Sequence, residues 1–273
     1  MRLLQKAGRV RVMGILNVTP DSFSDGGRFI TEEAILAQVA DMVAAGADII
    51  DVGGESTRPF AEPVPVAQEL ARVIGAITAI RKHHPVPISI DTTKAAVARE
   101  ALAAGADMIN DISALRFDAE MIGVVRATDV PVIIMHMQGT PGTMQIAPVY
   151  KDVVAEIAAF LEERLRWAES MGVARERFIV DPGIGFGKTV SHNLLIIKRL
   201  QEFTRIGCPL LVGHSRKAFI GKVLGQEVGE REIGTAAVSV LAAMNGAAIL
   251  RVHDVAKTVQ AVRMAEAIMN ATA

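Results

Sequence analysis

Eight short apolar runs, each followed by polar or charged residues, constrain the fold of this chain more than any other feature. The runs cover residues 10–16, 49–50, 88–90, 108–109, 132–135, 178–180, 210–212 and 249–250. The segments between them are long enough to hold a helix. Strand and helix alternating in this way predict an α/β protein, a TIM (β/α)8 barrel, whose functional residues follow the C-terminal ends of the strands.

Length and composition agree with this architecture. The chain has 273 residues and such barrels typically need about 250, so we expect one domain over residues 1–273. The formal net charge of −1 provides no basic field for nucleic acid. The single cysteine, Cys208, excludes a disulfide framework, is expected to pack in the core and favours a cytoplasmic location. The first residues lack the apolar stretch of a signal peptide.

Residues 233–250 carry no charge over a length that touches the lower limit of a membrane span. Their high alanine content and the helix-stop pair Asn245-Gly246 favour a buried helix followed by the last strand, so no membrane association is expected. The Ala and Ser faces of this helix also suit contact with a second copy. Another helix is expected to open at Thr31, and the longest helix is expected over residues 152–171.

Two long loops rich in proline and glycine, residues 18–30 and 53–66, follow the first two apolar runs. Long loops over the mouth of a barrel are usually binding loops or lids. The alternative is a pair of surface insertions without a function.

Four polar residues follow four different runs: Asp91, Asn110, Asp181 and Lys217. Because the strand ends of a barrel face one mouth, we expect these side chains to converge. Two carboxylates, an amide and an ammonium group suit a flat, nitrogen-rich heterocycle with N–H donors and a carbonyl acceptor. The alternative for any one of them is a helix cap or a surface turn, and Asp91 in particular could cap the helix that follows it.

The last run leads into Arg251-Val252-His253, whose alternation points Arg251 and His253 the same way. A guanidinium and an imidazole near the first strand predict an anion site, where barrels commonly bind phosphate. Asn17, at the end of the first run, offers an oxygen ligand for Mg²⁺. A purely structural His253 is the alternative.

Two other segments resemble binding motifs, one for phosphate and one for a soft metal. Residues 183–189 resemble a phosphate-binding Walker A loop, but Pro182 stands where the first glycine is required. Met135, His136 and Met137 could bind a soft metal, although packing is the more common role. We therefore expect Met135 to line the substrate pocket.

Eight stretches, in order along nearly the whole chain, resemble those of the dihydropteroate synthase family. They are GILNVTPDSFSDGG, DVGGESTRP, SIDTTK, INDISA, MHMQGTP, DPGIGFGK, GHSRKAFIG and RVHDV. The resemblance implies a transferase that joins 6-hydroxymethyl-7,8-dihydropterin diphosphate to 4-aminobenzoate. The products are 7,8-dihydropteroate, for folate synthesis, and pyrophosphate. It also implies inhibition by sulfonamides, which mimic 4-aminobenzoate, and a homodimer formed through the last helices.

The resemblance also implies a role for each candidate residue. The pterin is bound by Asp91, Asn110, Asp181 and Lys217. Mg²⁺ is held by Asn17, and the diphosphate is contacted by Thr57, Arg251 and His253. The 4-aminobenzoate pocket is formed by Phe186 with Phe23, Asp25, Ser56, Thr57, Arg58 and Pro59. The expected catalytic residues are Asp25, Asp91, Lys217, Arg251 and His253. Near the second pocket, Phe60 and Ala218 differ from the common family pattern.

We expect an SN1-like path in which the C–O bond to the diphosphate breaks before the amine attacks, with SN2 as the alternative. Mg²⁺, Arg251 and His253 stabilise the leaving group, and Asp91 stabilises positive charge on the pterin. Two other functions compete with this interpretation. A methyltetrahydrofolate–corrinoid methyltransferase shares the pterin-binding barrel but needs no diphosphate site, and a noncatalytic pterin carrier needs no leaving-group residues.

Overall fold

The computed structural model describes residues 9–19, 31–57 and 61–272. The predictions for Phe23, Asp25, Arg58, Pro59 and Phe60 lie outside the described residues.

Eight parallel strands form one sheet in the order β6-β5-β4-β3-β2-β1-β8-β7, and a bridge between Val180 and Leu210 joins its two ends. The strands are β1 (Arg11–Asn17), β2 (Ile49–Gly53), β3 (Ile88–Asp91), β4 (Met108–Asp111), β5 (Val132–Met135), β6 (Phe178–Asp181), β7 (Leu211–Val212) and β8 (Ile249–Val252). Each coincides with one of the apolar runs. The predicted TIM barrel is therefore confirmed.

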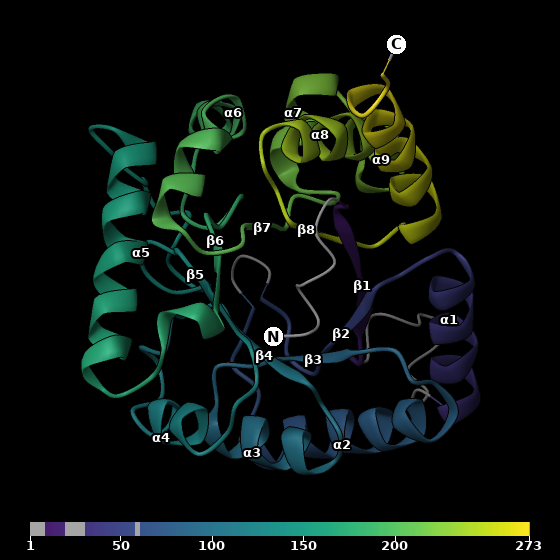
Figure 1. Ribbon diagram of the computed structural model, residues 1–273. Coiled ribbons are helices and arrows are strands. Elements are labelled where there is room, and N and C mark those ends of the chain that lie inside the picture. Colours follow the sequence, from purple (N-terminus) through teal and green to yellow (C-terminus); the bar gives the residue numbers. More distant parts are fainter. Residues whose placement is uncertain (1–8, 20–30, 58–60, 273) are drawn as a thin grey trace.

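Helices surround the ring of strands (Figure 1). They are α1 (Glu32–Ala44), α2 (Val66–His83), α3 (Ala95–Ala103), α4 (Met121–Arg126), α5 (Val153–Ser170), α6 (Val190–Lys198), α7 (Ala218–Leu224), α8 (Glu232–Met244) and α9 (Val255–Met269). The larger apolar core joins these helices to the strands, and Cys208 is buried in it as predicted. Among the described helices, none is long and apolar enough to cross a membrane.

A second, smaller apolar cluster fills the barrel. Its members come from seven different strands and are all fully buried: Met13, Ile49, Met108, Ile133, Ile179, Leu211 and Ile249. We call this cluster the plug. Side chains alternate across a strand, so residues two positions beyond the plug also point into the barrel, closer to its C-terminal mouth.

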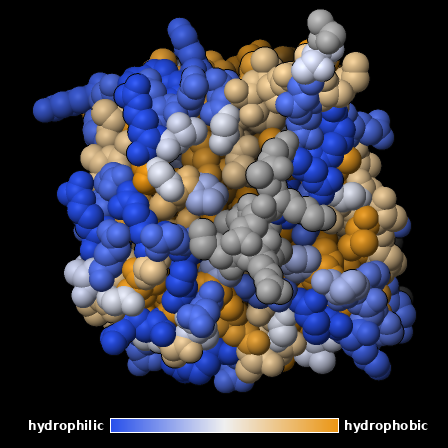
Figure 2. Space-filling model, in the orientation of Figure 1, coloured by the Kyte–Doolittle hydropathy of each residue, from blue (hydrophilic) through white to orange (hydrophobic). Residues whose placement is uncertain are grey.

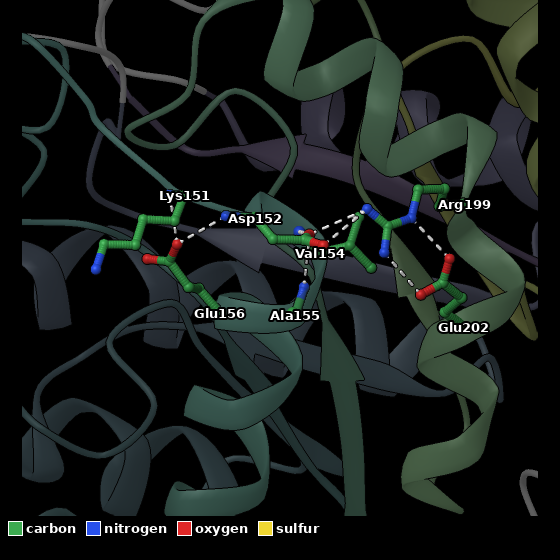
Figure 3. Close-up of polar contacts among 7 residues, drawn as sticks. All are labelled: Lys151, Asp152, Val154, Ala155, Glu156, Arg199 and Glu202. Atoms are coloured by element: carbon green, nitrogen blue, oxygen red, sulfur yellow. Dashed lines mark hydrogen bonds and ion pairs between the residues drawn. The ribbon is translucent and has the colours of Figure 1, made fainter.

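Capping side chains set the helix starts. Thr31 Oγ1 accepts the N–H of Ala34 at 3.2 Å, which confirms the predicted start of α1. At α5, Asp152 Oδ1 accepts the N–H groups of Val154 and Ala155, and Arg199 pairs with both Asp152 and Glu202 (Figure 3). Helix α5 lies within the predicted range 152–171. It is not the longest helix, because α2 has the same 18 residues.

Helix α8 differs from its prediction as a buried helix. Ser239 and Ala242 are buried within the chain, whereas Ile233 is 80% and Met244 57% exposed. Thr235, Ser239, Ala242 and Ala243 therefore face the barrel, whereas Ala237 is exposed, and contact of this helix with a second copy stays a prediction. The absence of charge indicated burial, but an apolar helix that lies on a surface buries only one side. Apolar surface lies over α7 and α8 at the upper edge of Figure 2.

Candidate active site

A layer of polar side chains lies directly above the plug. Asp51, Asn110, Asp181 and Arg251 each follow a plug residue by two positions on β2, β4, β6 and β8. The first three are at most 5% exposed. On these four strands an inward apolar residue is followed, two positions later, by an inward polar residue. The interior of the barrel therefore changes from apolar to polar between two neighbouring layers of side chains.

Arg251 connects this layer across the barrel. Its Nε donates to Asp51 Oδ2 at 2.5 Å, and its Nη2 donates to Asp91 Oδ2 at 2.5 Å. Asn110 Nδ2 donates to Asp51 Oδ2 at 3.2 Å. Burial raises the pKa of Asp91 to about 7, although the charge of Arg251 opposes this. The expected role of Arg251 as an anion ligand stays a prediction, because in this structure its guanidinium is paired with carboxylates.

The alternative role of Asp91 as a helix cap is not observed. The N–H of Ala95, at the start of α3, donates to Asp118 Oδ2 at 2.7 Å instead. Asp91 is therefore directed to the barrel mouth, where it meets Arg251.

Asp181 of the polar layer and Lys217, at the start of α7, form the other side of the site. Asp181 Oδ1 accepts the N–H of Gly183 at 2.7 Å. Burial lowers the pKa of Lys217 to about 7. The negative charges of Asp181 and Asp91 act to raise this pKa, and the positive charge of Arg251 acts to lower it. The structure thus brings the four residues of the predicted heterocycle site together: Asp91, Asn110, Asp181 and Lys217.

An apolar wall flanks these charges. It consists of Ile112, Met135, Met137, Met144 and Phe186. Met135 pairs in register with Asp181, and the ammonium group of Lys217 lies 3.9 Å from the centroid of the Phe186 ring. A flat ring bound here would meet apolar surface on its faces and polar groups at its edges, which is the usual design of a heterocycle pocket.

Three N–H groups of the glycine-rich loop 182–188 are used within the protein and are not available to a phosphate. The N–H groups of Gly183, Gly185 and Phe186 are used by Asp181, Asn193 and the Gly183 carbonyl. A Cβ on Gly183 would lie 1.9 Å from the carbonyl oxygen of His136, and the residue has φ of +71°. The glycine there serves close packing, in agreement with the rejected Walker A interpretation.

Two buried residues of the site were not singled out from the sequence. Asp51 directly follows the run 49–50, and so carried the same positional signal as Asp91. Lys188 is 4% exposed, and its Nζ donates to the Phe186 carbonyl at 2.8 Å and contacts His136 Nδ1 at 3.1 Å. Burial holds the pKa of Lys188 well below its ordinary value. Only the fold reveals this lysine, because His136 directly follows β5 and lies more than 50 residues before it in the sequence.

At the end of β8, His253 Nδ1 lies 3.0 Å from Ser215 Oγ. Across the mouth, Ser56, Thr57, Asp91 and Lys94 line a cavity of about 350 Å³. The predicted residue Thr57 therefore lies beside the pterin candidate Asp91, on the loop that follows β2.

Comparison with known proteins identifies the family. The model of the family described as pterin binding enzyme matches residues 13–253. The dihydropteroate synthase of Escherichia coli K12 is 50% identical over 263 residues, 95% of this chain and 92% of that protein. The Synechocystis dihydropteroate synthase is 49% identical over 261 residues, 95% of this chain and 90% of that protein. This chain belongs to the dihydropteroate synthase family of pterin-binding enzymes.

Solved structures of the dihydropteroate synthase family agree. A Yersinia pestis dihydropteroate synthase in a sulfonamide drug complex has a TM-score of 0.92 and 44% identity, covering 96% of this chain and 95% of that one. A Xanthomonas albilineans dihydropteroate synthase with 4-aminobenzoic acid has a TM-score of 0.92 and 46% identity, covering 98% and 95%. As a member of the dihydropteroate synthase family, the chain is a transferase of folate biosynthesis.

The residues near Asn17 fit a magnesium ion. Register pairs Asn17 with Gly53 and Gly53 with Asp91, across β1, β2 and β3. A Cβ on Gly53 would lie 3.8 Å from both Asn17 Oδ1 and Asp91 Oδ2, so the glycine leaves room beside these two oxygen atoms, of which Asp91 Oδ2 also accepts from Arg251. Mg²⁺ prefers such ligands and takes only one or two from protein, with the rest from water and phosphate. The described residues include no ready-made cluster of three His, Cys, Asp or Glu ligands.

Proposed function

We propose that this chain condenses 6-hydroxymethyl-7,8-dihydropterin diphosphate with 4-aminobenzoate, forming 7,8-dihydropteroate and pyrophosphate. The observation that carries the proposal is the polar layer above the plug, with Asp91, Asn110, Asp181 and Lys217 at one mouth. A Xanthomonas albilineans relative of 44% identity is solved with 7,8-dihydropteroate, and the Yersinia pestis relative with a sulfonamide. We extend both ligand classes to this chain.

In this proposal the pterin lies between Met135 and Phe186, with its edges on the polar layer. The ring N–H and amino groups donate to Asp181, while Lys217 donates to the ring carbonyl or a ring nitrogen. A neutral amide such as Asn110 supplies both a donor and an acceptor. These contacts fix the exocyclic methylene toward Asp91 and Arg251.

The leaving group occupies the side of Asn17, Thr57, Arg251 and His253. The C–O bond at the methylene breaks, its electron pair stays on the diphosphate, and positive charge spreads over the electron-rich pterin. Arg251 stabilises the departing anion, and the Asp91 carboxylate stabilises the cation. Asn17 would hold Mg²⁺, which would supply further charge neutralisation for the diphosphate. The lone pair of the 4-aminobenzoate amine then forms the C–N bond, and the nitrogen loses one proton to water or to the released pyrophosphate.

The pairing of Arg251 with Asp51 and Asp91 supports an SN1-like path. Two carboxylates close to one guanidinium leave the site with negative charge to offset a developing cation. A direct SN2 displacement gains less from that charge, because less positive charge develops at the methylene.

We also propose a cytoplasmic homodimer. On α8 and α9 the outward side chains include Ile233, Leu241, Met244, Met264 and Ile268, which are 48–80% exposed. We call this surface the α8–α9 face. Large contiguous apolar surfaces are uncommon on soluble monomers and usually mark an interface. The free thiol of Cys208 suits a reducing compartment.

The test is incubation of the protein with the pterin diphosphate, 4-aminobenzoate and Mg²⁺. We expect dihydropteroate and pyrophosphate in a one-to-one ratio, and neither product when 4-aminobenzoate is omitted. Transfer of a methyl group from methyltetrahydrofolate to a corrinoid would favour the methyltransferase alternative. Pterin binding without any product would favour the noncatalytic carrier.

A further inference from the structure

A partly buried charge cluster, in which Glu69 is fully buried, lies beside the polar layer but belongs to none of the roles described above. Lys94 Nζ donates to Glu69 Oε2 at 2.5 Å and to Glu55 Oε2 at 2.9 Å. The side chain of Glu69 is 0% exposed, that of Glu55 18% and that of Lys94 19%. We call these three residues the Lys94 clamp. Its members come from three elements: the loop after β2, the first turn of α2 and the turn between β3 and α3.

The clamp holds the loop that follows β2 at both of its ends. Glu55 lies at the start of this loop, and its Oε1 accepts the N–H of Val64, near the loop's end, at 2.7 Å. Its other oxygen, Oε2, is held by Lys94. One carboxylate therefore closes the loop on itself and fastens it to the end of β3.

The root of the same loop is packed against α2 as well. A Cβ on Gly54 would lie 2.7 Å from Val73 Cγ1 and 3.1 Å from Glu69 Cγ. Arg72 donates to the Gly54 carbonyl at 2.7 Å. The backbone that leads into Ser56 and Thr57 is thus fixed by its neighbours on α2.

The position of the clamp links the two substrate sides. Ser56 and Thr57 directly follow Glu55, while Asp91 precedes Lys94 by three residues. Glu55, Thr57, Asp91 and Lys94 all line the cavity at the barrel mouth. A shift of the Lys94 ammonium would therefore move the loop relative to the strand end that carries Asp91.

Stability alone does not account for this cluster. A buried ion pair often stabilises a protein no better than apolar residues of the same volume. Among the described residues, Glu69 Oε1 is buried without a hydrogen-bond partner, and the charge of Glu69 contributes to raising the pKa of Asp91. A costly, incompletely paired arrangement beside the active site indicates a positioning role.

We propose that Lys94 is a positioning residue for the second substrate. The Lys94 clamp holds Ser56 and Thr57 against the Asp91 end of β3, so that the 4-aminobenzoate side of the site is formed before that substrate binds. This inference rests on the proposed function. On the pterin side, Asn110, Asp181 and Lys217 form none of the clamp's hydrogen bonds, and Asp91 keeps its own bond to Arg251.

The test compares Lys94→Met, Lys94→Arg and the double variant Lys94→Met/Glu69→Gln with wild type. The matched control is Arg81→Met, because Arg81 pairs with Asp107 at the opposite end of the barrel. We expect Lys94→Met to raise the KM for 4-aminobenzoate by roughly 10- to 100-fold, with the KM for the pterin diphosphate nearly unchanged. Lys94→Arg, which can still reach both carboxylates, restores most of the affinity, and Arg81→Met alters neither KM.

The double variant separates positioning from an unpaired buried charge and remains informative if the single variant fails to fold. We expect it to keep the raised KM. A wild-type KM in the double variant, or an equal rise in both KM values, would overturn the proposal.

Hydrogen exchange supplies a readout that does not depend on catalysis. In Lys94→Met we expect lost protection at residues 55–57 and at Val64, with protection of β6 unchanged. Unchanged exchange of the loop would overturn the proposal even if the enzyme is active. Absence of product in the wild type, with the loop still loosened by Lys94→Met, would contradict the proposed function and leave the clamp intact.

Discussion

At the level of single residues, the site places charged side chains where burial disfavours their charged form. Lys217 is placed among Asp181, Asp91 and Arg251, and burial lowers its pKa to about 7 from an ordinary value of 10.5. The site thus holds an amine that is close to losing its proton in the absence of ligand. A bound heterocycle with a carbonyl acceptor would stabilise the charged form, so ligand binding and protonation of Lys217 are linked.

This burial predicts how stability depends on pH. Between about pH 7 and 10.5 the unfolded chain keeps a proton that folded Lys217 has released, so the free energy of unfolding rises with pH, by at most about 1.4 kcal/mol per pH unit. Below pH 7 both states hold the proton and this contribution to the slope disappears. Lys217→Met removes the contribution. Urea unfolding from pH 6 to 10 should give a smaller slope for the variant above pH 7, and parallel curves would contradict the assignment.

Position after a strand predicted the convergence of Asp91, Asn110, Asp181 and Lys217, because in a parallel barrel every strand end faces one mouth. Partners across the barrel were not predictable in the same way. Whether Arg251 contacts an anion or two carboxylates depends on how far its long side chain reaches across the barrel. The residues next to it in the sequence do not show this. The Lys94 clamp was missed for a similar reason, since its members are distant in the sequence.

At the level of elements, apolar runs located all eight strands, because both faces of a barrel strand are buried. The outward face of α8 was not predicted. Hydropathy reports how apolar a helix is, whereas its orientation on the barrel decides which side is covered. Loop 182–188 shows the reverse case: its glycines resemble a phosphate-binding motif, but the φ of +71° at Gly183 and its contact with His136 reveal a packing role.

Loop 182–188 therefore provides a stability prediction. Gly183→Ala should lower the free energy of unfolding by about 2 kcal/mol or more, because the new Cβ meets backbone and the left-handed conformation is strained. Gly75→Ala is the control: Gly75 lies at an exposed position of helix α2 with open space around it, so alanine should stabilise by about 0.5–1 kcal/mol. Thermal or urea unfolding measures both. Equal effects of the two substitutions would mean that the loop tolerates a Cβ at residue 183.

At the level of the whole molecule, the α8–α9 face leaves apolar side chains without a partner in one chain. We expect light scattering to report twice the chain mass of 29.1 kDa. Ile233→Glu/Met264→Glu should restore the 29.1 kDa species, because two charges in each copy cannot be buried in an apolar interface. Ile146→Glu is the control, since Ile146 is 69% exposed on the β5–α5 loop. A 29.1 kDa mass for the wild type would contradict the homodimer.

The central claim joins the polar layer above the plug to pterin chemistry, and one comparison of rates tests it most directly. Asp181→Asn replaces a carboxylate of that layer, and Asp107→Asn replaces one at the opposite end of the barrel, where it accepts the N–H of Ile88. Pyrophosphate release is measured for folded protein with both substrates and Mg²⁺. We predict that Asp181→Asn lowers the rate of pyrophosphate release by roughly 10- to 100-fold, which corresponds to the loss of a hydrogen bond to a charged group. We predict a near-wild-type rate for Asp107→Asn. Equal rates for the two variants would place the chemistry elsewhere on the molecule.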